Sequence, residues 1–117
     1  MDSQEFIDAV KLAVRDSAVS EILGILSSPP GRRPKQEITE MSAWYNSLDM
    51  DQRRMVAGVI KEAADSAVFG FLCVLDGVRA VEDSPHKGHF ELRYVKDGVT
   101  LLNAPEDEML HDIFNSK

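Results

Sequence analysis

The stretch SLDMDQRRMVAGVIKEAADSAVFGFLCVLDG, from Ser47 to Gly77, decides the fold of this chain. Ser47 is of a type that caps helix N-termini, and Asp49 and Asp51 follow in the first turn, where the helix dipole favours acids. An apolar stripe at helical spacing comes next and includes Met55, Val56, Val59 and Ile60. Residues 67–75 (AVFGFLCVL) are apolar on every side, which indicates a segment surrounded by protein. We therefore expect a long, buried central helix with Gly77 as its C-terminal cap.

The last part of this stretch also fits a β-hairpin. Residues 71–75 and 78–81 would be its strands, and Asp76–Gly77 would be its type I′ turn. A helix to Leu75 is favoured because helical spacing continues through the run and because the run is poor in β-branched residues. The pattern by itself leaves helix or strand open for residues 69–75.

A first long helix is expected over residues 3–27. Asp2 and Glu5 have the spacing of a capping pair. The apolar residues that follow lie on two faces, which predicts burial on two sides or a kink near Asp16–Ser17. Residues 28–36 (SPPGRRPKQ) then form a loop within the domain, because their three prolines and one glycine exclude a regular element.

A small antiparallel sheet is expected in the C-terminal part of the chain. Residues 78–82 alternate between apolar and polar types, as in a strand. Residues 89–96 and 99–103 flank Asp97–Gly98, which is the stronger of the two hairpin signals.

Two shorter helices complete the predicted order. Residues 37–46 carry one apolar edge, and residues 104–114 start with Pro and acidic residues after Asn103, a plausible N-cap. The predicted class is α+β: a long N-terminal helix, a short helix, a long buried central helix, a small antiparallel sheet with its hairpin at Asp97–Gly98, and a short C-terminal helix. The central helix is expected to pack between the first helix and one face of the sheet, which is too small to stand alone.

Length and composition limit the number of domains, the kinds of partner and the cellular compartment that we expect for this chain. The 117 residues suffice for one compact domain, residues 1–117. A net charge of −7 argues against nucleic acid and anionic membranes as partners, because both repel an acidic surface. The single cysteine, Cys73, fits a reducing compartment, and the chain start lacks the basic and apolar parts of a signal peptide. No apolar run reaches the ~20 residues of a membrane span, so we expect a cytoplasmic protein.

One candidate surface for a protein partner combines Arg32 and Arg33 of the proline-rich loop with Trp44 and Tyr45. Trp and Tyr are frequent anchors of interfaces, and arginine pairs well with carboxylates. The plainer interpretation is that the arginines are solvated and that Trp44 packs on the central helix as a lid of the core.

A weaker candidate pocket joins Asp76, Glu82, His89 and His111, which could serve acid–base chemistry if they converge. Each residue also has a purely structural interpretation: Asp76 as a turn residue, Glu82 as the end of a strand, His89 as a loop residue and His111 as a helix residue. The chain has no nucleophile-elbow motif and no phosphate-binding glycine motif, so no cofactor is predicted. His86 and His89 are three residues apart, a spacing that can share a metal ion, but an exposed loop between two strands explains both residues, so no metal site is predicted.

These observations favour a non-enzymatic protein–protein interaction module, of the inhibitor or immunity type, by analogy of size, charge and class. A small enzyme or ligand-binding domain is the alternative, and it requires the four residues of the weaker pocket to share one cavity. A homodimer that buries apolar helix faces is a third hypothesis.

Overall fold

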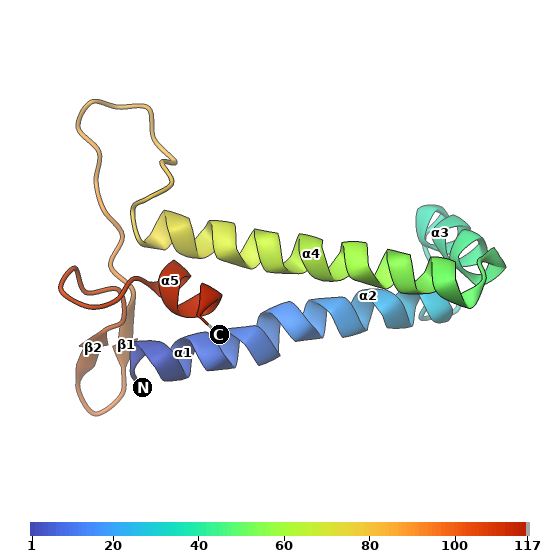
Figure 1. The fold of residues 1–117 in the computed structure, drawn as a ribbon, viewed down its shortest axis with the longest axis horizontal. Helices are drawn as coiled ribbons and strands as arrows, with labels where there is room; N and C mark the ends of the chain where they lie inside the picture. The colour runs from blue at the N-terminus through green and yellow to red at the C-terminus, as the bar shows by residue number, and fades with distance from the viewer. Residues whose placement is uncertain (117) are drawn as a thin grey trace. The chain divides into compact units, whose positions relative to one another are not determined.

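A computed structural model of the chain describes residues 1–116 and confirms the α+β class (Figure 1). In chain order the elements are α1 (Ser3–Val10), a π-helical turn η1 (Lys11–Asp16), α2 (Ser17–Ser27), α3 (Gln36–Ser47), α4 (Met50–Leu75), β1 (Arg93–Val95), β2 (Val99–Leu101) and α5 (Leu110–Asn115). The chain divides into two compact units. We call residues 15–65 the helical unit, and residues 1–14 with the chain from residue 66 onward the sheet unit. The assignment of residues 1–117 to a single domain stays a prediction.

The expected N-terminal helix is present from Ser3 to Ser27, interrupted by the π-helical turn. Its start is the predicted capping pair, since the Asp2 side chain accepts a hydrogen bond from the Glu5 amide at 2.8 Å. The π turn ends at Asp16, next to the position at which the sequence pattern offered a kink as the alternative to burial on two sides. A π turn closes wider hydrogen-bonded rings than an α turn, which shifts the face on which later side chains lie.

The helix alternative is confirmed for residues 69–75, because α4 continues to Leu75. Gly77 is its cap, with φ of 78°. The Gly77 amide donates to Val74 O at 3.1 Å and the Val78 amide donates to Cys73 O at 3.0 Å. These two bonds define a Schellman motif, which ends the helix and rules out the hairpin at Asp76–Gly77.

The prediction of Ser47 as the N-cap of α4 was wrong. Ser47 closes α3, where its hydroxyl donates to Trp44 O. The cap is Asp49, which forms a reciprocal capping box with Gln52: Asp49 Oδ1 accepts from the Gln52 amide at 2.8 Å, and Gln52 Oε1 accepts from the Asp49 amide at 3.0 Å. The Asp-x-x-Gln spacing was present in the sequence and satisfies two backbone donors, whereas a serine cap alone satisfies one.

The sheet is smaller than expected. The Asp97–Gly98 hairpin is confirmed, with φ of 52° and 134° at these residues, and β1 pairs antiparallel with β2. The strand over residues 78–82 was wrong, because this segment has no ladder partner in the described chain. Asn103 is not an N-cap either, since α5 begins at Leu110.

The core of the sheet unit is built around α5. Its buried side chains are Ile7 from α1, Leu72 from α4, and Leu110, Ile113 and Phe114 from α5. Thus α5 lies between α1 and the C-terminal end of α4 (Figure 1). The central position in this core was expected for α4 and is occupied by α5. Burial in α4 is one-sided here: Leu72 and Cys73 are buried, whereas Phe71 is 63% exposed.

The helical unit joins α2, α3 and residues 50–65 of α4. Two side chains of α3 fasten it to the end of α2, where carbonyl groups lack helical partners. Ser42 Oγ donates to Leu26 O at 2.7 Å, and Asn46 Nδ2 donates to the same oxygen at 3.2 Å. Val19, Leu26 and Tyr45 are buried in this unit. Among residues 1–116, no helix is both long and apolar enough to span a bilayer.

Candidate functional site

The structure separates the residues of the predicted partner surface. Arg32 and Arg33 are exposed in the loop before α3. Trp44 is 55% exposed, whereas the neighbouring Tyr45 is only 9% exposed. Tyr45 packs against the guanidinium group of Arg53, which lies 5.4 Å from the ring centroid. Trp44 therefore remains available to a partner, and Tyr45 belongs to the core of the helical unit.

Trp44 stands beside an apolar groove of the helical unit. The groove has a volume of about 280 Å³ and is lined by side chains from three helices. They are Ile22, Ile25 and Leu26 of α2, Ile38, Met41 and Trp44 of α3, and Val56 and Ile60 of α4. Every lining side chain is apolar except for the indole nitrogen of Trp44, so the groove suits an apolar side chain of another molecule.

Exposed apolar residues continue this surface along α4. Val59 lies three residues after Val56, and Met55 four residues before Val59, so they are neighbours on the helix surface. Their exposed fractions are 72% for Met55 and 67% for Val59. We call the exposed set the Trp44 patch: Ile22, Met41, Trp44, Met55 and Val59. The sequence pattern placed Met55 and Val59 on the buried stripe of the central helix, so only Trp44 of this patch was anticipated as a contact residue.

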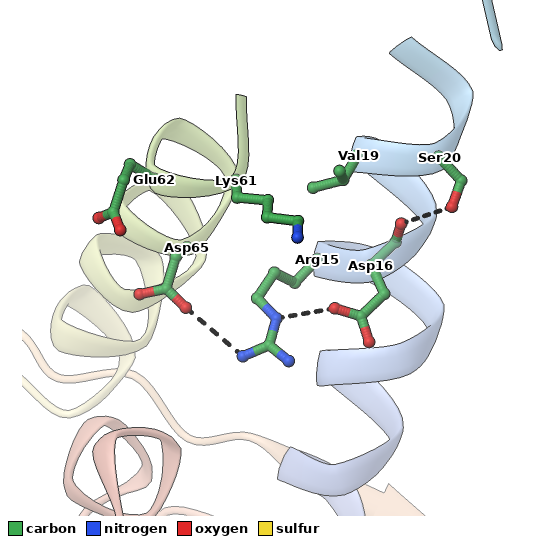
Figure 2. A pocket seen from close by; sticks show the side chains of 7 residues that line it. All are labelled: Arg15, Asp16, Val19, Ser20, Lys61, Glu62 and Asp65. Atoms are coloured by element: carbon green, nitrogen blue, oxygen red, sulfur yellow. Dashed lines mark hydrogen bonds and ion pairs between the residues drawn. The ribbon is translucent and has the colours of Figure 1, made fainter. Parts of the chain in front are cut away.

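A second cavity of the helical unit is charged. It has a volume of about 540 Å³ and lies between the start of α2 and α4 (Figure 2). Arg15 occupies its centre, with its Nε 3.0 Å from Asp16 Oδ1 and its Nη1 3.4 Å from Asp65 Oδ1. Lys61 and Glu62 extend from the neighbouring turns of α4. Because three carboxylates line the cavity against two cationic side chains, its lining has a negative net charge, which disfavours the binding of an anion.

The weaker candidate pocket is assembled only in part. His111 Nδ1 lies 2.7 Å from Asp76 Oδ2, and the two side chains are 15% and 2% exposed. Asp76 and His89 line one cavity of about 260 Å³, but Glu82 and His111 do not line it. Glu82 instead accepts a hydrogen bond from the Gly88 amide at 2.9 Å, within the loop that precedes β1.

Asp76 has a structural role that sequence reasoning missed. Its carboxylate accepts hydrogen bonds from the amides of Leu110 at 3.1 Å and His111 at 2.8 Å. These amides are in the first turn of α5, where backbone donors lack helical partners. A residue at the end of α4 therefore caps α5, and no spacing rule relates positions so far apart in the chain.

Asn103 links three backbone segments of the sheet unit. Its amide nitrogen donates to Leu75 O and Phe90 O, both at 2.9 Å, and its oxygen accepts from the Leu92 amide at 2.8 Å. The loop between α4 and β1 is thereby attached to the end of α4. Within residues 1–116, no group of three or more His, Cys, Asp or Glu side chains is arranged to hold a metal ion.

The acidic charge is unevenly distributed. Residues 1–14 and 66–117 contain six Lys or Arg and twelve Asp or Glu, a net charge of −6. The helical unit contains seven basic and eight acidic residues, a net charge of −1. The Trp44 patch therefore lies in the nearly neutral unit.

Comparison with known proteins adds no relative: no family model, no curated protein and no solved structure matches this chain.

Proposed function

We propose that this chain is a non-enzymatic protein–protein interaction module, of the inhibitor or immunity type, that docks a protein through the Trp44 patch in the cytoplasm. The observation that carries the proposal is Trp44 itself, 55% exposed beside a groove of apolar side chains. A large aromatic residue over an apolar pocket is the typical energetic centre of a protein interface.

The composition of the patch supports the same function. Met41 and Met55 are exposed, flexible side chains that adapt to a partner's surface, and Met41 lines the same groove as the indole ring of Trp44. Contiguous exposed apolar surface is uncommon on isolated monomers and marks interaction sites. Arg32 and Arg33 add positive charge in the same unit, so we expect binding to weaken as salt concentration rises.

A non-enzymatic function is supported by the bonds of Asp76. Both carboxylate oxygens are occupied by the amides of α5, and one also contacts His111. A carboxylate used in this way stabilises the fold, and its acceptor positions are largely taken by protein donors. The negative net charge and the single buried cysteine support a cytoplasmic interaction protein without a nucleic-acid partner.

Affinity capture from the cells that express the protein tests this function. Wild type is compared with Trp44→Ala and with the control Val81→Ala, which removes an exposed apolar side chain of the loop after α4 (61% exposed). A protein retained by wild type and Val81→Ala but lost with Trp44→Ala supports the proposal, as does weaker retention at high salt. Equal retention by all three baits would overturn it.

A second candidate function is a small ligand-binding or enzymatic domain. The expected convergence of all four residues of the weaker pocket is not found, and the observation that remains in favour of this candidate is the cavity that Asp76 and His89 share. Thermal unfolding in the presence of a metabolite library tests it: a ligand that raises the Tm of wild type but not of His89→Ala would support this candidate over the first. Identical Tm shifts for both chains would remove it.

A further inference from the structure

We propose that the outer edge of β1 binds an extended peptide of basic net charge, which joins the β1–β2 hairpin as a third strand. Every second side chain of this peptide enters an apolar groove between β1 and α1. This surface is separate from the Trp44 patch, and all of the residues that line its groove belong to the sheet unit.

The groove has a volume of about 330 Å³ and lies between α1 and β1 (Figure 1). Every side chain that the N-terminal helix contributes to it is apolar, from Met1 and Phe6 to Val14. The opposite wall consists of residues 92–94, with Leu102 beside them. A lining of this kind suits apolar side chains of another molecule.

The two walls of the groove are fixed relative to each other. Ser3 Oγ of α1 donates to Leu102 O at 2.7 Å. Phe6 and Leu92, one from each wall, both pack against the buried cluster that includes Ile7. The groove is therefore preformed, which lowers the ordering cost of binding a ligand.

Backbone groups of β1 lack partners at its outer edge. Hydrogen-bonded and non-bonded residue pairs alternate along an antiparallel ladder. The Leu102 amide donates to Leu92 O at 2.8 Å. The next pair along β1, Arg93 with Leu101, is therefore non-bonded, and by the same alternation Val95 is in a non-bonded pair as well. The N–H and C=O groups of Arg93 and Val95 point away from β2, toward the outer edge.

These groups select an extended peptide as the occupant. Within residues 1–116, β1 pairs with β2 alone, and an unpaired edge presents donors and acceptors at the spacing of another strand. The groove is lined by the consecutive residues 92–94, whose side chains alternate between the two faces of the hairpin, so it extends along the edge of β1. A strand added there bonds to Arg93 and Val95 and directs alternate side chains toward the apolar wall of α1.

The charge of the sheet unit favours a basic peptide. The unit has a net charge of −6, and opposite charges across an interface promote association. Arg93 lines the groove, but its Nη2 lies 2.9 Å from Glu91 Oε1, so its charge is compensated within the hairpin. A second copy of this chain would bring another unit of net charge −6 to the same edge, and like charges suppress association.

The first experiment selects peptides on the immobilised full chain from a phage-displayed library of random sequences about ten residues long, enough for one strand. Enriched peptides should carry apolar residues at alternate positions with Lys or Arg between them. As synthetic peptides they should bind with dissociation constants of about 1–100 µM. A library that yields no binder, or binders without this alternation, overturns the inference.

Backbone methylation of the selected peptide tests for strand addition. An N-methyl group removes a donor, and only alternate amides of an added strand face β1. Methylation should therefore weaken binding by about tenfold or more at every second residue and by less than about threefold at the residues between. A loss without this alternation overturns the added strand.

A matched pair of proline variants locates the edge. Val95 and Val99 lie directly opposite each other and are 71% and 61% exposed. Proline removes the outward amide of β1 in Val95→Pro and that of β2 in Val99→Pro, and neither amide bonds within the hairpin. Val95→Pro should weaken peptide binding by about tenfold or more, whereas Val99→Pro should stay within about threefold of wild type.

Filling the groove gives a second test that leaves the strands intact. Ala9 lines the groove, and Ala80 is an exposed residue of the loop after α4. Ala9→Trp should weaken peptide binding by about tenfold or more, because its indole ring occupies the site of a peptide side chain. Ala80→Trp, the control, should bind as wild type does. Far-ultraviolet circular dichroism checks that each variant is folded.

The outcomes separate this inference from the proposed function. Equal affinities of wild type, Val95→Pro and Ala9→Trp overturn the site at β1. Loss of peptide binding in Trp44→Ala, with Ala9→Trp unaffected, places the peptide on the Trp44 patch and overturns the inference while the interaction function stands. A wild-type chain that doubles its mass of 13.0 kDa in light scattering, while Val95→Pro does not, assigns the edge to a second copy and overturns the peptide.

Discussion

Replacement of Asp76 with alanine should detach α5 from the core of the sheet unit. The Asp76 side chain is 2% exposed and accepts hydrogen bonds from the amides of Leu110 and His111. Loss of a helix cap costs about 0.5–2 kcal/mol, and each buried donor left without an acceptor costs about 1–3 kcal/mol. The two costs overlap, because the cap and the donors are the same bonds, so we expect a loss of about 3 kcal/mol in the free energy of unfolding.

Asp76→Asn should have a smaller effect. The amide keeps one acceptor oxygen but turns an NH₂ group toward a backbone donor, which predicts a loss of about 1–2 kcal/mol. Urea unfolding followed by circular dichroism measures both variants, and a loss of about 3 kcal/mol should lower the midpoint by more than about 1 M. Amide exchange at Leu110 and His111 locates the effect, since these two donors should exchange faster than in wild type.

Asp83→Ala is the matched control for Asp76→Ala. Asp83 is exposed and forms no hydrogen bond within the described residues, so its removal should change the unfolding free energy by less than about 0.5 kcal/mol. If Asp76→Ala is as stable as Asp83→Ala, and exchange at Leu110 is unchanged, the capping of α5 by Asp76 is refuted.

Three further changes test the fold by urea unfolding. Gly77→Ala should lower the free energy of unfolding by about 1–2 kcal/mol, because φ at Gly77 is +78°. Gly24→Ala should raise it by up to about 1 kcal/mol, because an added Cβ meets no atom within 4 Å. Equal effects of the two changes would contradict the Schellman motif at Gly77. Leu110→Ala should cost about 2–5 kcal/mol since the side chain is fully buried, and Met109→Ala, at 42% exposed, should cost clearly less. Asn103→Ala should lower the free energy of unfolding by about 2–3 kcal/mol, because three hydrogen bonds to backbone groups are lost. A loss below about 0.5 kcal/mol would show that Asn103 is not what attaches the loop between α4 and β1 to the end of α4.

Local signals in the sequence predicted most of the helical elements. The capping pair at Asp2 and Glu5, the end of α4 at Gly77 and the hairpin at Asp97–Gly98 all depend on bonds between residues a few positions apart. Such bonds form wherever the residue types occur at the right spacing, so periodicity and turn chemistry suffice to find them.

The candidate sites were predicted less well, for a physical reason that differs from site to site. Exposure of Trp44 could be anticipated as an interface property, but Met55 and Val59 have the spacing of a buried stripe and are nevertheless exposed. Periodicity shows which side chains share a face of a helix and cannot show what covers that face. Tyr45 follows Trp44 directly and is buried, because consecutive residues of a helix point about 100° apart.

The amino-acid sequence by itself determined the class of the fold, the long helices with the caps at Asp2 and Gly77, and the uneven distribution of acidic residues. Only the tertiary structure decided that α5, rather than α4, lies at the centre of the sheet-unit core, that Asp76 caps a helix 34 residues away, and that residues 78–82 form no strand. Hydrogen bonds between distant segments form only after apolar side chains such as Leu110 and Phe114 have brought those segments together. Their partners are therefore set by packing, which no local pattern records.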